Sequence, residues 1–227
     1  MEKLDKKLIQ KRRIMKYFIE ATYEIMEDEG IDMVTIRKVS DIAGYNSATL
    51  YNYFDNIDHL MAFASLKYLK SYADNLPKFT STAKNPVEKY LKIWECFCFY
   101  SFQNPVLYHK IFFEEFGNSL NTSLKEYYEI FPNELTKEEA EEFNEMMLHH
   151  NIYDRTEASL EKCVREGYFS KDDIKSISEV SLLIYEGMLD RIISKMHKIE
   201  VEEAVTKTIL HIKNSISFYL KKEVLAN

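Results

Sequence analysis

Residues that interrupt helices are scarce in this chain, which has 5 glycines and 4 prolines among 227 residues. Apolar residues recur at three- and four-residue spacing, the pattern of helices that bury one face, and no segment shows the alternation of a strand. Hydrophobic residues make up 46% of the chain, so a sizeable core can form. The sequence therefore predicts an all-α fold, as one large domain or two small ones.

The N-terminal third divides into four predicted helices. The first runs from about residue 4 to 29, and Gly30 is expected to close it as a left-handed residue. Two short helices follow. The fourth is expected to begin with Asp55 as its N-cap, and to fade before Pro77, where 77–85 is the best candidate for a linker.

Later helices are marked by capping residues at their predicted starts. Asparagine followed by proline is typical of an N-cap with proline at the first helical position. Serine or threonine followed three residues later by an acidic residue forms a capping box. The last two helices, about 171–196 and 200–222, are long and amphipathic. The predicted starts are Asn85-Pro86, Asn104-Pro105, Thr136 with Glu139, and Ser170 with Asp173.

The stretch "TIRKVSDIAGYNSATLYNYF", residues 35–54, is the most informative segment of the chain. Thr35 precedes an apolar-periodic run and is a good N-cap, Gly44 breaks that run, and Asn46 caps the next one. Two helices of about two turns, joined by a short turn that contains glycine, form a helix-turn-helix pattern. On spacing alone, a pair of short surface helices explains the pattern as well as DNA binding does.

In a helix-turn-helix, the second helix presents its first turn to the major groove of DNA. Its side chains here are short, so the backbone can approach the bases closely. The following tyrosines and asparagine can donate hydrogen bonds, and the preceding helix supplies positive charge. The candidate DNA-binding residues are Thr35, Arg37, Lys38, Asn46, Ser47, Ala48, Thr49, Tyr51, Asn52 and Tyr53.

The segment resembles the N-terminal domain of the TetR family of transcriptional regulators. Thr35-Ile36-Arg37, Ala43-Gly44 and the block "TLYNYF" at 49–54 stand in register with the family's pattern, and the match covers about residues 8–60. The resemblance implies a DNA-binding domain at 1–56, a connecting helix at 57–75, and a helical effector-binding and dimerisation domain at 76–227.

Three positions depart from the family's pattern. Tyr45 replaces a smaller apolar residue, and Ser40 stands where alanine is usual in the helix packing. Ile57 occupies the place of a lysine that contacts a phosphate in the family. The last departure removes one expected contact with the DNA backbone but does not threaten the fold.

The charge of the chain is unevenly distributed. The formal net charge is −7, but residues 1–72 carry 11 basic and 11 acidic side chains. Within residues 1–16 there are 7 basic and 2 acidic side chains, a local excess of positive charge. A basic N-terminus on a neutral segment is compatible with DNA contact at one end of the chain, although solvated helix starts are often rich in lysine too.

The resemblance implies a small-molecule effector, and the residues offer their own support. Residues 90–131 contain 13 aromatic side chains, which leave irregular space that packs poorly without an occupant. An aromatic stripe is nevertheless more often plain core than a ligand pocket. The candidate effector-binding residues, for an apolar or aromatic compound, are Trp94, Phe97, Phe112, Phe113 and Phe116.

The resemblance also implies a two-fold dimer. The last two predicted helices carry more apolar surface than a half-buried terminal pair needs, so we expect them to form a four-helix interface with a second copy of the chain. The candidate interface residues are Leu183, Ile184, Met188, Ile192, Ile209, Ile212, Ile216 and Tyr219.

No catalytic, metal or cofactor site is predicted. His149 and His150 lie near Glu142 and Glu145, but no histidine follows a glutamate by three residues, as a di-iron bundle requires. Of the 3 cysteines, Cys96 and Cys98 lie in the apolar stretch "WECFCFYSF" and are expected to be buried thiols. No segment is long and apolar enough for a membrane span or a signal peptide, so a cytoplasmic protein is expected.

The sequence thus predicts a dimeric, ligand-responsive, DNA-binding transcriptional regulator. We expect a repressor that a small apolar or aromatic effector releases from a palindromic operator. The alternative is a helical small-molecule-binding protein, or an enzyme, whose N-terminal helices do not bind DNA.

Overall fold

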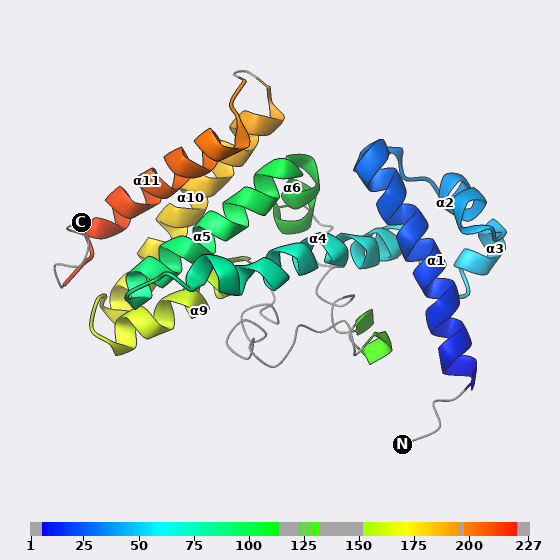
Figure 1. Ribbon diagram of the computed structural model, residues 1–227, viewed down its shortest axis with the longest axis horizontal. Coiled ribbons are helices and arrows are strands. Elements are labelled where there is room, and N and C mark those ends of the chain that lie inside the picture. Colours follow the sequence, from blue (N-terminus) through cyan, green and yellow to red (C-terminus); the bar gives the residue numbers. More distant parts are fainter. Residues whose placement is uncertain are drawn as a thin grey trace. The chain divides into compact units, whose positions relative to one another are not determined.

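The computed structural model describes residues 6–113, 123, 126–127, 129–131, 152–195 and 198–221. All regular elements of these residues are α- or 3-10 helices, and no strand occurs among them (Figure 1). The prediction of an all-α fold is confirmed. No helix in this part of the chain is long and apolar enough to cross a membrane.

The described residues fall into two compact units. Unit 1 lies within residues 1–70 and 110–136, and unit 2 lies within 71–109 and 137–227. Unit 1 therefore combines the predicted DNA-binding segment with a later piece of chain, a pairing that only the folded structure reveals.

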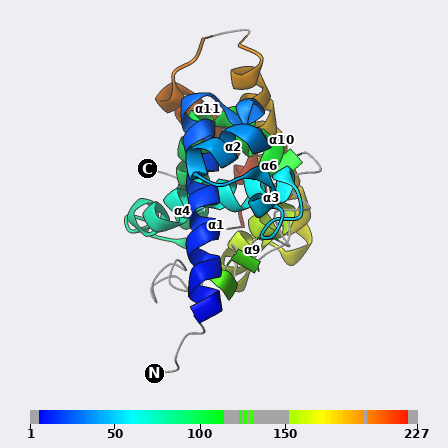
Figure 2. The ribbon, with the colours of Figure 1, turned by 90° about the vertical axis from the view of Figure 1, so that its right-hand side faces the viewer.

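Unit 1 is built on one long helix that buries a single face. The buried positions of α1 recur three and four residues apart, α2 packs against this helix, and α3 packs against α2 (Figure 2). Met15, Phe18, Val39 and Leu50 are fully buried and form the centre of the unit. The helices are α1 (Lys6–Asp28), η1 (Ile31–Met33), α2 (Ile36–Ala43), α3 (Ser47–Leu50) and the first part of α4 (Ile57–Thr80).

Two details of these helix ends differ from the sequence-based expectation. Gly30 has the expected positive φ of 94°, but its ψ of 160° lies outside the left-handed helical region. At the start of α4, Asn56 Oδ1 accepts a hydrogen bond from His59 N at 2.8 Å, so Asn56, and not Asp55, caps the helix. The Asp55 N–H instead donates to His59 Nδ1 at 3.2 Å, which completes the cap through the histidine ring.

Helix α4 also continues beyond the predicted end, through Pro77 to Thr80. Proline has no N–H to donate to the preceding turn, which is why the helix was expected to fade there. Leu76 is fully buried and Ser81 N donates to Pro77 O at 2.9 Å, so packing and the following turn hold the helix together. The expectation that α4 ends before Pro77 was wrong.

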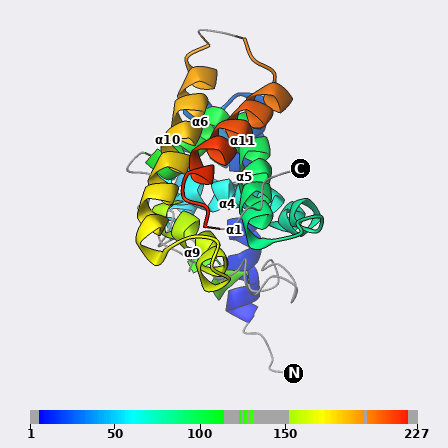
Figure 3. The same cartoon turned by 90° about the vertical axis from the view of Figure 1, so that its left-hand side faces the viewer.

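Unit 2 is centred on α5, which packs against α9, α10 and α11 (Figure 3). Tyr90 on α5 donates a hydrogen bond to Ser181 Oγ on α10 at 2.8 Å, deep in the core. Phe102 and Tyr185 stack with ring centroids 5.7 Å apart. The helices are α5 (Pro86–Gln103), α6 (Pro105–Phe113, whose end belongs to unit 1), α9 (Ile152–Arg165), η4 (Lys171–Asp173), α10 (Ile174–Ile193) and α11 (Val201–Ser217).

Three of the four predicted capping signals mark helix starts in the structure. Asn85 Oδ1 accepts from Glu88 N at 2.9 Å, and Pro86 is the first residue of α5. Pro105 is likewise the first residue of α6. Ser170 and Asp173 form the predicted capping box ahead of α10. The fourth signal, Thr136 with Glu139, lies outside the described residues.

The three cysteines are free and buried, as predicted for Cys96 and Cys98. Burial raises the pKa of Cys96 to about 12 and that of Cys163 to about 12, and it raises the pKa of Cys98 as well. Thiols with such pKa values stay protonated near neutral pH, so they serve as small core residues.

We expect Ser40→Ala to stabilise unit 1. Ser40 is buried on α2, and its hydroxyl has no hydrogen-bond partner among the described residues. Removing an unsatisfied buried hydroxyl should raise the free energy of unfolding by roughly 1 kcal/mol, or about 2–4 °C in melting temperature. Thermal unfolding measures this, with Ser47→Ala at an exposed position as the matched control. A lower melting temperature for Ser40→Ala would show that the hydroxyl has a partner.

Candidate nucleic-acid interface

The turn between α2 and α3 has the geometry that the sequence predicts. Thr35 caps α2, since its Oγ1 accepts from Lys38 N at 3.3 Å. Gly44 ends α2 in the left-handed conformation, with φ 73° and ψ 27°, and the N–H groups of Gly44 and Tyr45 both donate to Ser40 O. A left-handed residue at this point reverses the chain tightly, so Asn46, the N-cap of α3, follows two residues after the cap of α2.

Helix α3 is short and strongly capped. Asn46 Oδ1 accepts from both the backbone N of Thr49, at 2.8 Å, and its hydroxyl, at 2.9 Å. The α-helical part spans four residues, fewer than the two turns expected, and continues as hydrogen-bonded turns to Phe54. The Thr49 hydroxyl therefore helps to hold the helix start in addition to any contact with DNA.

Two apolar residues fix the orientation of α3. Leu50 and Phe54 are buried, and the Phe54 ring meets Phe18 at 6.3 Å and Phe63 at 5.5 Å, edge to face in both cases. Because one face of the helix is anchored in this way, Ser47, Ala48 and Tyr51 lie on the solvent side. Tyr51 is 54% exposed, a large fraction for an aromatic ring.

Of the ten predicted DNA-binding residues, seven are exposed and three are half-buried. Lys38, Thr49 and Tyr53 are half-buried. Lys38 Nζ is also paired with Glu29 Oε2 at 2.7 Å, so part of its charge is already balanced within the protein. The exposed members are Thr35, Arg37, Asn46, Ser47, Ala48, Tyr51 and Asn52.

This arrangement coincides with a known family signature. Residues 18–62 match the family model described as "Bacterial regulatory proteins, tetR family". The chain therefore carries, at its N-terminus, the helix-turn-helix domain of the TetR family. TetR-family proteins are DNA-binding helix-turn-helix regulators, and the matched residues include α2, α3 and the turn between them.

Several solved structures share the fold over nearly the whole chain. A regulator from Haloarcula marismortui is 18% identical, with a TM-score of 0.56, and the match covers 92% of this chain and 99% of that one. FadR from Thermus thermophilus, in complex with lauroyl-CoA, is 14% identical, with a TM-score of 0.57 and coverage of 94% and 98%. RolR, in complex with resorcinol, is 12% identical, with a TM-score of 0.59 and coverage of 91% and 89%. No curated protein matches the sequence.

The predicted effector-binding residues are only partly brought together. Trp94 and Phe97 are buried in unit 2, with ring centroids 6.0 Å apart, and both pack against Tyr185. Phe112 and Phe113 are half-buried and belong to unit 1, and Phe116 lies outside the described residues. Within unit 2, the two rings are tightly packed core residues.

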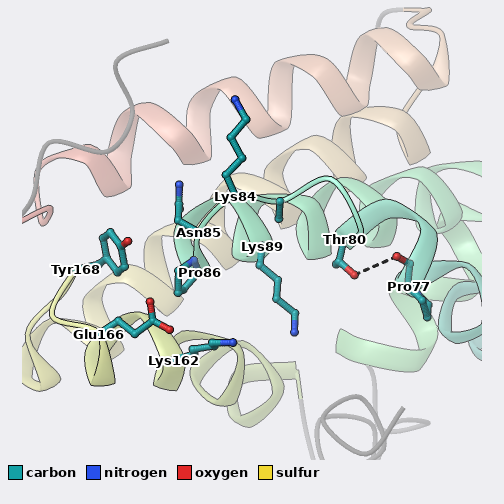
Figure 4. A pocket seen from close by; sticks show the side chains of 10 residues that line it. Pro77, Thr80, Lys84, Asn85, Pro86, Lys89, Lys162, Glu166 and Tyr168 are labelled. Carbon is teal, nitrogen blue, oxygen red and sulfur yellow. Dashed lines mark hydrogen bonds between the residues drawn. The ribbon is translucent and has the colours of Figure 1, made fainter. Parts of the chain in front are cut away.

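A cavity of about 390 Å³ occurs elsewhere in unit 2 (Figure 4). It lies where the end of α4 and the start of α5 meet the end of α9, and none of the predicted effector residues lines it. Its walls are largely polar, unlike the apolar pocket that the aromatic stripe predicts. They include Pro77, Thr80, Lys89, Lys162, Glu166 and Tyr168.

The predicted interface residues divide into two groups. Met188, Ile212 and Ile216 are buried within the subunit, so they belong to its own core. Ile184, Ile192, Ile209 and Tyr219 are half-buried, and Leu183 is 62% exposed. Two further apolar residues on or just after α11 are exposed although they were not predicted: Leu210, at 52%, and Phe218, at 87%. Both residues lie outside the periodic pattern of buried positions along α11, and an apolar residue outside that pattern could have been predicted from the sequence to be exposed.

Among the described residues, no group of three or more histidine, cysteine, aspartate or glutamate side chains could hold a metal ion. His149, His150, Glu142 and Glu145 lie outside the described residues.

Proposed function

We propose that this TetR-family protein is a ligand-responsive repressor that binds a palindromic operator as a homodimer. The observation that carries the proposal is the solvent face of α3, which is held by its Asn46 cap and by buried Leu50 and Phe54 while Ser47, Ala48 and Tyr51 point outward. Short side chains at the helix start let the backbone come close to base edges, and a tyrosine hydroxyl can reach a base or a phosphate.

A homodimer and a palindromic operator are expected together, because two identical subunits read two identical half-sites. A single recognition helix of this length reads only a half-site, and useful affinity needs two of them, roughly 34–36 Å apart or a multiple of that distance. The exposed apolar residues of α10 and α11, above all Leu183 and Leu210, supply a surface that a second copy can cover. Gly187 is exposed one turn after Leu183, where the absence of a side chain lets a partner helix approach.

We further propose that an apolar or aromatic small molecule controls DNA binding. The similar structures of RolR and FadR were solved with resorcinol and lauroyl-CoA, an aromatic compound and a fatty acyl thioester. In this chain, two described residues of the later segment of unit 1, Lys110 and Glu126, contact the DNA-binding part of that unit. Lys110 Nζ pairs with Asp32 Oδ1 at 2.9 Å, and Glu126 Oε2 lies 3.3 Å from His59 Nε2. A shift of this segment on effector binding would act directly on α4 and on the α1–α2 connection.

Selection of bound sequences from a random DNA pool tests the proposal. We expect an enriched palindrome whose binding weakens steeply as salt rises, because phosphate contacts release counterions. An asymmetric site would contradict the two-fold arrangement. Failure to retain any DNA at low salt would contradict the proposed function as a whole, in favour of a small-molecule-binding protein or an enzyme.

Trp94 allows the effector to be sought without a label, because it is the chain's single tryptophan. It is buried against Tyr185, at 5.6 Å between ring centroids, so an occupant among these aromatic rings should change its emission. We expect a compound that shifts Trp94 fluorescence to weaken operator binding by about 5- to 150-fold, the range of typical allosteric coupling. If compounds saturate the fluorescence change and operator affinity stays constant, the effector proposal is wrong.

We expect Ile57→Lys to strengthen DNA binding. Ile57 is the half-buried first residue of α4, at the position where the family resemblance places a phosphate-contacting lysine. One added phosphate contact should steepen the slope of log K against log salt by about 0.9. A positive charge at a helix start costs about 0.3–1 kcal/mol, which will offset part of the gain in affinity. The control is Ile57→Gln, which has no charge, and an unchanged salt slope for Ile57→Lys would count against the placement.

A further inference from the structure

The exposed face of α1 carries a cation that the helix-turn-helix pattern does not include. Ile9, Arg13 and Tyr17 recur every four residues along this face, and all three are exposed. Arg13 has no acidic residue three or four positions away on its helix, and no ion-pair partner among the described residues. The neighbouring Lys16, in contrast, lies 3.9 Å from the carboxylate of Glu20.

Arg13 is joined to the recognition helix through two tyrosines. Its guanidinium carbon lies 6.0 Å from the centre of the Tyr17 ring, and a hydrogen bond with the Tyr17 hydroxyl raises the pKa of Arg13. The Tyr17 ring lies 6.1 Å from that of Tyr45, which packs on Phe18 at 5.4 Å. Tyr45 stands between Gly44 and Asn46, the residues that end α2 and cap α3.

The distance from the Arg13 guanidinium to the Tyr17 ring and the distance from that ring to Tyr45 are each about half the width of the DNA major groove, which is roughly 12 Å. A helix lying in the groove has a phosphate backbone on either side. The Arg13 guanidinium therefore lies no more than about 12 Å from the ring of Tyr45, the residue before the cap of α3, a distance comparable to the width of the groove that α3 would enter. Tyr45, one of the departures from the family's pattern, supplies the ring that braces Tyr17 and with it Arg13.

We propose that Arg13, braced by Tyr17 and Tyr45, binds a backbone phosphate beside the recognition helix. This inference rests on the proposed DNA-binding function and adds a contact that the motif does not contain. Arg13 adds a cation from α1 to the proposed DNA interface, which lacks the cation at the start of α4 because Ile57 replaces the family's lysine there. Because a phosphate contact is independent of base sequence, Arg13 should strengthen specific and non-specific binding alike.

The test compares Arg13→Gln with Lys16→Gln by fluorescence anisotropy, on the selected site and on unrelated DNA, over a series of salt concentrations. Both changes remove one exposed positive charge from the same helix. We expect Arg13→Gln to reduce the salt slope by about 0.9 and to weaken binding to both DNAs by about tenfold at 0.1 M salt, and Lys16→Gln to change neither. Equal effects of the two variants would overturn the proposal, because they would indicate only the net charge of α1.

A second variant separates the brace from the charge. Tyr45→Val keeps Arg13 but removes the ring against which Tyr17 packs, so we expect weaker binding to both DNAs with the selected sequence unchanged. Tyr17→Phe removes only the hydroxyl bonded to Arg13 and keeps the aromatic ring. It therefore tests the brace without the loss of packing that could affect the valine variant. Wild-type affinity in both variants would contradict the bracing. If the wild-type protein binds no DNA, the proposed function and this inference fail together; if it binds and Arg13→Gln keeps its salt slope, this inference alone is wrong.

Discussion

Leu183→Arg should convert the protein into a monomer and remove most of its affinity for the operator. Leu183 lies on the outer face of α10 and is 62% exposed, so the change leaves the subunit's own core intact. In a two-fold interface each subunit presents the same patch, and the variant brings two unpaired guanidinium groups into an apolar contact. Loss of the linked second half-site should lower operator affinity by roughly 10²- to 10⁴-fold.

The measurements are light scattering for the oligomeric state and anisotropy for the operator. Tyr153→Arg on α9 is the matched control, because Tyr153 is a similarly exposed apolar residue, at 50%, outside the proposed interface. We expect the control to remain a dimer with wild-type affinity. Should Leu183→Arg also remain a dimer and bind the operator normally, α10 would not form the interface.

Gly44→Val should unfold the helix-turn-helix or distort its turn. Gly44 has a φ of 73° and a ψ of 27°, and a Cβ atom added there would meet nothing within 4 Å. The cost is therefore one of backbone conformation alone, about 1–3 kcal/mol for a side chain in the left-handed region and greatest for a β-branched one. Since this turn sets the angle of α3, specific DNA binding should fall together with stability.

Gly44→Asn is the informative companion to this variant. Asparagine adopts the left-handed conformation more readily than other residues, so its loss of stability should be clearly smaller than that of valine. Thermal unfolding followed by circular dichroism ranks the variants, and binding to the selected site reports the turn. If valine and asparagine were equally harmless, the turn would not require the left-handed conformation that the structure shows.

The sequence by itself determined the elements whose causes are local. Thr35, Asn46 and Asn85 are caps in the structure because each side chain bonds to the backbone three residues ahead, an interaction that needs no distant partner. The left-handed Gly44 has the same local origin. These signals were sufficient to predict the all-α class and the helix-turn-helix.

Local signals failed where tertiary packing competes with them. Asp55 and Asn56 are both good caps, and the structure uses Asn56, whose Oδ1 accepts from His59 N. Ring contacts with Phe54 and Phe63 hold His59 in place, and its Nδ1 accepts from the Asp55 N–H. Pro77 is a strong helix breaker by sequence, yet buried Leu76 keeps α4 helical to Thr80. The sequence likewise predicted a free charge on Lys38 for contact with DNA, but in the folded chain Lys38 is paired with Glu29.

Only the tertiary structure decided which apolar faces are core and which are free. Helices α10 and α11 carry apolar residues on more than one face, so periodicity cannot tell the face that packs within the subunit from the face left for a partner. Packing against α5 buries Ile212 and Ile216 and leaves Leu183 and Leu210 in solvent. The same holds for Arg13, whose place near α3 depends on rings from α1 and the α2–α3 turn that meet only in the folded chain. Burial is a property of the whole fold, because it depends on which surfaces distant segments cover, and no local pattern in the sequence contains that information.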